Sequence, residues 1–184
     1  MSADVKDTTA AEKRVWVFGY GSLIWDGWEV ERGCVGREVA TLPGYRRSFN
    51  KLSQRNWGTK RAPCPTLNLQ ADRSASCQGM AFAFPTARRN ELLAYLNERE
   101  GRNFALHPLF ISLHGGAGVE AFVPLYTGKN LCGDMSLDER VRMIRSARGT
   151  DGAGIDYVLG LAEKLDELGI VDPAVRELQA TLCV

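Results

Sequence analysis

The stretch VWVFGYGSLIW, residues 15–25, joins an apolar run to a glycine-rich turn. Residues Val15 to Phe18 are hydrophobic enough to form a buried strand. The next four residues, Gly19 to Ser22, interrupt that run before the chain becomes apolar again at Leu23. Glycines allow the backbone to approach a ligand closely or to adopt a positive φ, and successive free N–H groups in such a turn bind anions. The stretch therefore predicts either a plain tight turn or bulge, or a site for a carboxylate or a developing oxyanion.

Three common glycine motifs do not fit this turn. The chain holds no Gly-Lys-Ser/Thr, which a phosphate-binding P-loop requires. In the dinucleotide fingerprint a glycine or alanine stands where this chain has Ile24. A nucleophile elbow needs G-x-S-x-G, which Gly21-Ser22-Leu23 does not supply, and the chain has only two histidines to serve as a base. Nucleotide binding and Ser-His hydrolysis are thus disfavoured.

Length and composition are those of one ordinary globular domain. The 184 residues are 45% hydrophobic and 24% charged, and a chain of this length buries roughly 70% of its unfolded surface. We predict a flexible tail over residues 1–13 and a single domain over residues 14–184. The formal net charge of +1 gives no reason to expect nucleic acid as a partner, and the sequence leaves the oligomeric state open.

The sequence predicts a cytoplasmic protein without a membrane segment or a metal site. The first dozen residues lack the apolar core of a signal peptide, and no stretch approaches the ~20 apolar residues that span a bilayer. The cysteines are odd in number and form no C-x-x-C pair, which is typical of reduced thiols. His107 and His114 make no zinc-ligand cluster with them. The cysteines are Cys34, Cys64, Cys77, Cys132 and Cys183.

Strand and helix patterns follow one another in an order typical of an α+β protein. Apolar or alternating runs predict strands at Arg14–Tyr20, Tyr45–Leu52, Gln78–Phe84, Leu106–Leu113 and Val119–Tyr126. Between the second and third of these, residues 56–72 are predicted to be mostly loop, with pairing of Thr66–Leu69 as a strand left open. Helices are predicted at Ala87–Glu100, Ser136–Arg148, Ile155–Leu168 and Pro173–Leu182, with N-caps at Thr86, Ser136 and Asp172. The expected architecture is a small mixed β-barrel or sheet with flanking helices.

The helix that ends in ELLAYLNEREG places one glutamate on an apolar face. At about 100° per residue, Glu100 falls between Leu93 and Leu96, whereas Glu98 falls on the polar face. A carboxylate on a buried face is costly unless it is hydrogen-bonded or protonated, and burial and the negative helix end both raise its pKa. These are the conditions for a general base. The alternative is that the last turn frays and Glu100 turns to water or pairs with a neighbouring arginine.

Three segments together resemble the ChaC-like γ-glutamylcyclotransferases. They are FGYGSLIW at residues 18–25, YLNEREG at residues 95–101 and ARGTDGAGIDYVLGLAEKLDELGIVDP at residues 147–173, and the resemblance extends over about residues 14 to 182. It implies a small mixed barrel with flanking helices and no metal or cofactor. Members of this family cleave γ-glutamyl compounds, typically glutathione, to 5-oxoproline and the remaining amine. For glutathione that amine is Cys-Gly, so the resemblance implies a small-molecule partner.

The resemblance also assigns roles to individual residues. The turn matches the motif that binds the γ-glutamyl group, and the glutamate at the helix end matches the catalytic glutamate. Two tyrosines fit less closely: one stands at a strand position from which the family takes a pocket tyrosine, and the other lies where the family has an Asn-x-x-Tyr-like pattern. In order, these residues are Tyr20, Gly21, Ser22 and Leu23, then Glu100, then Tyr126 and Tyr157.

The chain departs from the family pattern in two places. Residues 154–157 read Gly-Ile-Asp-Tyr, without the asparagine, and the loop over residues 54–69 has Asn-Trp-Gly-Thr and Pro-Cys-Pro where the family tends toward Arg-Gly-Thr and Pro-Gly. We expect this loop to border the leaving dipeptide. Strict specificity for glutathione is therefore open. The alternatives are other γ-glutamyl amino acids or γ-glutamylamines as substrates, or a γ-glutamyl-binding module without turnover.

The implied mechanism needs no enzyme nucleophile. Glu100 would remove a proton from the substrate's α-ammonium group, and the freed amine would attack its own γ-carbonyl and close a five-membered ring. The backbone amides of the turn would hold the α-carboxylate and the oxyanion. Glu100 would then return its proton to the departing amine.

Overall fold

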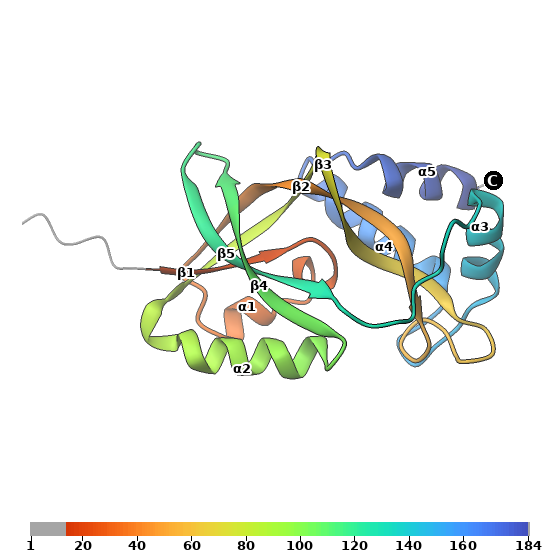
Figure 1. Ribbon diagram of the computed structural model, residues 1–184, viewed down its shortest axis with the longest axis horizontal. Helices are drawn as coiled ribbons and strands as arrows, with labels where there is room; N and C mark the ends of the chain where they lie inside the picture. Colours follow the sequence, from red (N-terminus) through yellow and green to blue (C-terminus); the bar gives the residue numbers. More distant parts are fainter. Residues whose placement is uncertain (1–13, 184) are drawn as a thin grey trace, which may run out of the picture.

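Five strands close into a small barrel in the structure, a computed structural model that describes residues 14–183 (Figure 1). The strands are β1 (Arg14–Gly19), β2 (Gly36–Ser53), β3 (Cys64–Pro85), β4 (Phe104–Leu113) and β5 (Gly118–Tyr126). Their order around the barrel is β1-β3-β2-β4-β5, and β1 and β5 run parallel where the barrel closes, whereas the other pairs are antiparallel. The predicted α+β class with a small mixed barrel is confirmed. The predicted tail over residues 1–13 lies outside the described residues.

The strands β2 and β3 are longer than the sequence predicts. We expected a loop over most of residues 56–72, but β3 begins at Cys64 and continues through that segment, and β2 begins well before the predicted strand. Residues 70–76 are largely exposed, so no alternation of apolar and polar side chains marks this part of the strand. The β2–β3 ladder shifts register after Pro43 and after Ser48. Such bulges bend a pair of strands without ending it, and the bent pair reaches the C-terminal helices (Figure 1).

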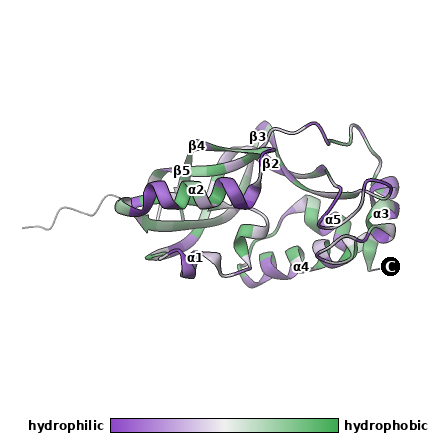
Figure 2. Cartoon of the chain, turned by 90° about the horizontal axis from the view of Figure 1, so that it is seen from below, coloured by the Kyte–Doolittle hydropathy of each residue, from purple (hydrophilic) through white to green (hydrophobic). Residues whose placement is uncertain are grey.

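The helices form two groups: one lies against the barrel, and the other lies beyond its end, to the right in Figure 2. One group holds α1 (Trp28–Glu31) and α2 (Arg89–Glu100), and the other holds α3 (Leu137–Ser146), α4 (Gly154–Glu167) and α5 (Pro173–Leu182). The second group packs together beside the outer ends of β2 and β3. The four helices predicted from the sequence are present with small differences in their bounds. The short helix α1 was missed because four residues are too few for a helical period.

Two of the three predicted N-caps are confirmed. Ser136 forms a complete capping box at the start of α3, and the Asp172 carboxylate accepts hydrogen bonds from two N–H groups of α5. Thr86 was the wrong N-cap for α2. Residues 86–88 form a 3-10 turn, and α2 begins only after Arg88, which makes no side-chain capping bond. Such tighter turns are common at the ends of α-helices.

Two hydrophobic cores lie on opposite sides of the barrel wall. The larger core joins the barrel to the three C-terminal helices, and the smaller one lies under α2. In the smaller core Leu92 and Leu96 of α2 pack over Phe82 and Trp28, and a fully buried leucine stabilises a fold by about 1.5–3 kcal/mol. These contacts fix the axis of α2, so the last turn of this helix, which ends at Glu100, is held against the barrel.

Candidate active site

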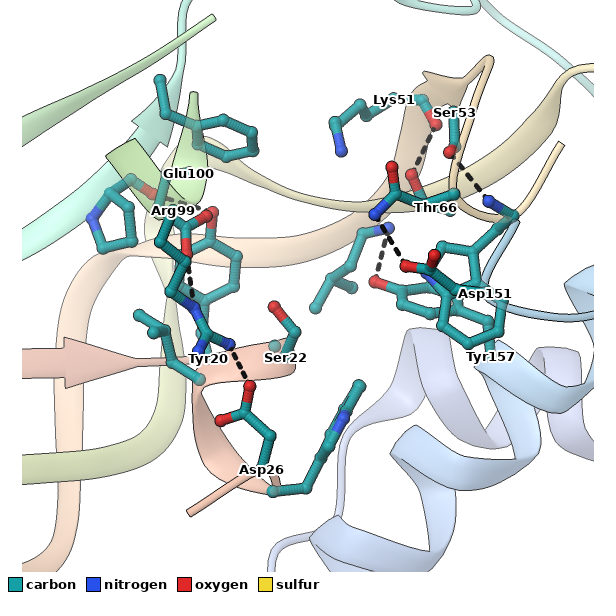
Figure 3. A pocket seen from close by; sticks show the side chains of 18 residues that line it. Tyr20, Ser22, Asp26, Lys51, Ser53, Thr66, Arg99, Glu100, Asp151 and Tyr157 are labelled. Carbon is teal, nitrogen blue, oxygen red and sulfur yellow. Dashed lines mark hydrogen bonds and ion pairs between the residues drawn. The ribbon is translucent and has the colours of Figure 1, made fainter. Parts of the chain in front are cut away.

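A cavity of about 410 Å³ opens between the end of β1 and the connection from β2 to β3 (Figure 3). One side, which we call the turn wall, consists of residues 20–23, 25 and 26 together with Arg99 and Glu100. The other side, which we call the loop wall, consists of residues 51, 53, 56 and 57 together with Asp151 and Tyr157. Both walls carry charged and polar side chains that face the same space. The cavity therefore suits a small, polar ligand.

The glycine turn is shaped by close packing rather than by positive φ. Neither Gly19 nor Gly21 has a positive φ. A Cβ on Gly19 would lie 3.0 Å from the Cβ of Leu23 and 3.1 Å from the Phe82 ring, so a larger residue would force these neighbours to shift. After Gly21 the residues Ser22–Ile24 form a short 3-10 helix. The N–H groups of residues 21–23 donate to no acceptor in the described part of the chain, as is usual for the first N–H groups of a helix.

Tyr20 is buried in the turn wall and its phenol is fixed. The hydroxyl donates a hydrogen bond of 2.8 Å to the carbonyl oxygen of Pro124. Burial, with a further contribution from the nearby Glu100 carboxylate, raises the pKa of Tyr20 well above its usual value. The phenol is thus neutral, and because its proton is directed at Pro124, its oxygen lone pairs are available to a donor in the cavity.

The turn wall rests on a buried ion pair that the sequence did not reveal. The Arg47 side chain is 0% exposed and lies 3.1 Å from the Asp172 carboxylate. Its Nε also donates a 2.9 Å hydrogen bond to the carbonyl oxygen of Tyr20. Asp172 in turn caps α5. One arginine on β2 thereby ties the glycine turn to the start of the last helix.

Glu100 lies where the helical wheel predicts, at the end of α2 and facing the cavity. Its side chain is 13% exposed, whereas Glu98 is exposed to solvent. The helix ends at Gly101, with φ of 78°, so the last turn does not fray. Burial raises the pKa of Glu100, and the Arg99 and Lys51 cations oppose that rise.

Arg99 is held beside Glu100 by a second carboxylate. Its Nη2 lies 2.6 Å from the Asp26 carboxylate, and its Nε lies 3.5 Å from Oε1 of Glu100. The alternative in which Glu100 pairs with a neighbouring arginine is thus present as a loose contact, while the close pair is the one between Arg99 and Asp26. Glu100 therefore keeps oxygen atoms directed at the cavity (Figure 3).

Tyr157 lines the cavity from the loop wall and is buried. Its hydroxyl accepts a 3.1 Å hydrogen bond from the N–H of Leu67, and burial raises its pKa. Its ring packs against Trp57, with the ring centroids 5.2 Å apart. At the outer edge of this wall Asn56 donates a 2.7 Å hydrogen bond to the Asp151 carboxylate. The loop wall thus combines an aromatic floor with a polar rim.

Tyr126 does not line this cavity, although the resemblance suggests a binding role for it. Its ring packs edge-on against Phe104, with centroids 5.2 Å apart, and its hydroxyl accepts a hydrogen bond from the N–H of Asn130. The other six residues proposed from the sequence do line the cavity, namely Tyr20, Gly21, Ser22, Leu23, Glu100 and Tyr157. The sequence did not predict three further charged residues of the cavity, Asp26, Lys51 and Arg99. Of these, only Arg99 could have been found from the sequence, because it lies in the YLNEREG segment.

The arrangement brings a desolvated carboxylate and a set of free backbone N–H groups to one polar cavity. A carboxylate whose pKa is raised by burial accepts a proton more readily than one in water, as a general base must, and free N–H groups stabilise a carboxylate or an oxyanion. Within residues 14–183 no group of three or more potential ligand side chains is placed to hold a metal ion. None of the described helices has the length and apolar character needed to cross a membrane.

The sequence and fold are similar to those of known proteins. The family described as ChaC-like protein matches residues 15–183. Gamma-glutamylcyclotransferase 2-3 of Arabidopsis thaliana is 30% identical, over 89% of this chain and 86% of its own length. Glutathione-specific gamma-glutamylcyclotransferase 1 of Danio rerio is 29% identical, over 96% of this chain and 93% of its own. The crystal structure of a yeast gamma-glutamylcyclotransferase specific to glutathione has a TM-score of 0.80 and 20% identity, and the match covers 92% of this chain and 96% of the yeast chain. The match to the yeast structure shows that the two proteins share the whole fold.

Proposed function

This chain belongs to the family of ChaC-like proteins, and from that premise we propose that it is a γ-glutamylcyclotransferase that cleaves glutathione to 5-oxoproline and Cys-Gly. The observation that carries the proposal is the position of Glu100, desolvated and on the same wall of the cavity as the free N–H groups of the glycine turn. The relatives named above support it, since each is a γ-glutamylcyclotransferase by name and the one from Danio rerio is named as specific for glutathione.

The reaction moves two protons between two nitrogen atoms of the substrate. The α-ammonium group must lose a proton before it attacks, and it loses a second when the ring N–H of 5-oxoproline forms. The amide nitrogen that leaves gains two protons and departs as an ammonium group. Glu100 relays these protons and ends the cycle in the state in which it began, so it acts as base and then as acid. The bond that forms joins the α-nitrogen to the γ-carbon, and the bond that breaks is the original γ-amide bond.

The turn wall would hold the γ-glutamyl group in its cyclising pose. The N–H groups of Gly21, Ser22 and Leu23 would bind the α-carboxylate and, as charge develops, the oxyanion. The oxygen of Tyr20 would accept a hydrogen bond from the α-ammonium group, because the Tyr20 proton is already directed at Pro124. Binding that holds the two reacting ends of a flexible chain together lowers the entropy that must be lost in the ring-closing step.

Asp26 and Arg99 would keep Glu100 ready to accept a proton. Arg99 stabilises the ionised carboxylate, and Asp26 fixes Arg99 in place. Without this cation, burial would hold Glu100 protonated over more of the pH range. The pair is therefore a positioning and tuning device rather than part of the bond changes.

Two alternatives keep the same pocket. In the first, the substrates are γ-glutamyl amino acids or γ-glutamylamines, with the loop wall as the cause. In the second, the protein binds γ-glutamyl compounds without turnover, which the desolvated Glu100 argues against, since a binding module needs no base. A cytoplasmic location and the lack of a nucleic-acid partner stay predictions from the sequence, supported by the free cysteines and the net charge of +1.

The direct test is product analysis. The purified protein is incubated with glutathione, and 5-oxoproline, glutamate and Cys-Gly are quantified together. Equal amounts of 5-oxoproline and Cys-Gly support the proposal, whereas glutamate with Cys-Gly would indicate a hydrolase. The same assay with γ-glutamyl amino acids and γ-glutamylamines tests the first alternative, in which these compounds are the substrates. If no substrate gives products, the second alternative holds, and the protein is a binding module.

A further inference from the structure

Lys51 brings a positive charge into the cavity. It lies on β2 in the loop wall, and its Nζ is 5.1 Å from the centroid of the Phe104 ring and 5.7 Å from that of Tyr126. No ion pair or side-chain hydrogen bond in the described part of the chain involves this ammonium group, although Glu100 lies near enough to interact with it electrostatically. Figure 3 shows the side chain directed at the cavity from the side opposite Glu100.

This unpaired cation is costly for the protein alone. Burial lowers the pKa of Lys51, as expected for a charge removed from water. The two aromatic rings offset part of that cost through cation–π contacts, but they supply no negative charge to pair with the ammonium group. Arg99, the other cation on the cavity, is paired with Asp26 at 2.6 Å. Of these two cations, Lys51 is thus the one free to bind an anion that the substrate brings.

The position of Lys51 is fixed at its base. The residue follows a bulge in β2, and its carbonyl oxygen accepts a 3.1 Å hydrogen bond from the Thr66 hydroxyl. A backbone bridge to Leu131 holds it on the other side. Only the four-carbon side chain is free to adjust, which suits a point contact with a ligand of variable reach.

If the proposed function is correct, the substrate has two carboxylates to place. The γ-glutamyl α-carboxylate goes to the turn wall, and the leaving nitrogen must lie beside Glu100 to receive its proton. The rest of the leaving group then extends toward the loop wall. Resting on that proposed function, we propose that Lys51 binds the carboxylate of the leaving group and so selects γ-glutamyl peptides and amino acids over γ-glutamylamines.

The charges at the rim favour this assignment over selection of a cationic leaving group. Asp151 is the acidic side chain on the loop wall, but its two oxygens already accept hydrogen bonds from Asn56 at 2.7 Å and from the Thr150 hydroxyl at 2.8 Å. An exposed carboxylate with these partners attracts a cation weakly. The desolvated and unpaired group on this wall is positive, so it favours a negative leaving group.

The test crosses two enzymes with two substrates. The kcat/KM for release of 5-oxoproline is measured for the wild type and Lys51→Met, each with glutathione and with glutathione whose C-terminal carboxyl is an amide. We expect the wild type to prefer glutathione over the amide by about 10- to 100-fold, the range of a charge-assisted hydrogen bond. Lys51→Met should lose most of that preference, mainly through KM for glutathione. Both substrates are compared at a pH above the acid limb of each enzyme, because Lys51 also lowers the pKa of Glu100.

Two control variants sharpen the result. Lys51→Arg should keep the preference, since it keeps the charge, and Lys60→Met should behave as wild type because Lys60 is an exposed lysine of the β2–β3 connection. A second substrate pair, γ-glutamylalanine and its amide, places the carboxylate closer to the leaving nitrogen. A Lys51-dependent preference for the acid over the amide in both pairs shows that the lysine reaches both carboxylate positions. The same preference in one pair alone shows that it reaches that position, and either result supports the proposal.

Several outcomes would overturn the proposal. A wild type that treats acid and amide alike in both pairs would do so, and so would a Lys51→Met variant that loses activity equally on both. Equal losses would mean that Lys51 acts on the γ-glutamyl group or on Glu100. If the wild type turns over no substrate, the proposed function fails instead. In that case, calorimetric Kd values for glutathione and its amide with the same variants test the role of Lys51 independently.

Discussion

The two walls of the cavity differ in how completely their charges are paired. In the turn wall Asp26, Arg99 and Glu100 form a continuous set of contacts, and the chain beneath is anchored by Arg47. In the loop wall Lys51 contacts aromatic rings and pairs with no anion among residues 14–183. The turn wall also carries the motif that resembles the family, whereas the loop wall carries the departures from it. From this difference we propose that the turn wall performs the reaction and that the loop wall selects the leaving group.

The largest expected effect comes from removing the base of the turn wall. Glu100→Gln should lower kcat by about a hundredfold to ten-thousandfold, the usual range for a general acid–base group, while KM for glutathione stays within a few-fold. Release of 5-oxoproline at saturating glutathione measures it. Glu98→Gln is the matched control and should be close to wild type, since Glu98 is exposed. A normal kcat for Glu100→Gln would mean that another group is the base.

The next effect concerns the support beneath the turn wall. Arg47→Met leaves Asp172 without its cation and removes the hydrogen bond to Tyr20, so we expect a loss of about 3–5 kcal/mol in the free energy of unfolding. Urea unfolding measures this loss. Arg46→Met is the control, because that neighbour is part-exposed and its contact with Asp72 is 3.4 Å. The control should cost less than about 1 kcal/mol, and equal losses in both variants would contradict the anchoring role.

A smaller effect should appear in the pH profile. Glu100 must be ionised to act as base, so kcat/KM falls as pH drops below its pKa. Arg99 and Lys51 lower the pKa of Glu100, while burial and Asp26 raise it. Arg99→Met removes one of the cations, so the pKa of Glu100 should rise and the acid limb of the profile should move to higher pH. Measuring kcat/KM for glutathione across the acid range checks this shift.

The control for this shift is Arg102→Met, since Arg102 is an exposed arginine two residues beyond Glu100. Its acid limb should coincide with that of the wild type. An Arg99→Met profile that moves to lower pH, or does not move, would show that Arg99 does not tune the base.

The smallest effect lies at the rim of the loop wall. Asn56→Ala breaks the exposed hydrogen bond to Asp151 and should raise KM for glutathione about two- to fivefold, with kcat unchanged. Gln54→Ala, also exposed on this connection, should leave both constants as they are. A loss of kcat in Asn56→Ala would place part of the chemistry in the loop wall and would break the division between the walls.

The sequence predicts most of the turn wall because local patterns determine it. The helical period alone places Glu100 on the apolar side of α2, and the glycine spacing marks the turn after β1. The reason for the glycines was not predictable, however. Gly19 packs closely against Leu23 and Phe82, and the contact with Phe82 depends on the packing of segments far apart in the sequence.

The loop wall and the buried ion pair depend on contacts that no local pattern records. Arg47 is fully buried because Asp172, far along the chain, meets it, and a charged residue in a strand is otherwise expected at the surface. Lys51 follows a bulge between two long strands, and the first part of β3, residues 64–72, falls in the segment predicted to be mostly loop. Tyr126 stands on the expected strand, yet its ring packs against Phe104, and Phe104 lines the cavity in its place.

The measurement that tests the central claim most directly is the reaction of glutathione in water enriched in oxygen-18, with the products identified by mass. In the proposed mechanism the substrate's own amine attacks the γ-carbonyl. The 5-oxoproline should therefore carry no oxygen-18 label and should equal Cys-Gly in amount. Labelled 5-oxoproline, or labelled glutamate in its place, would show that water attacks the γ-carbonyl. That result would contradict a turn wall that holds the γ-glutamyl group for attack by its own amine.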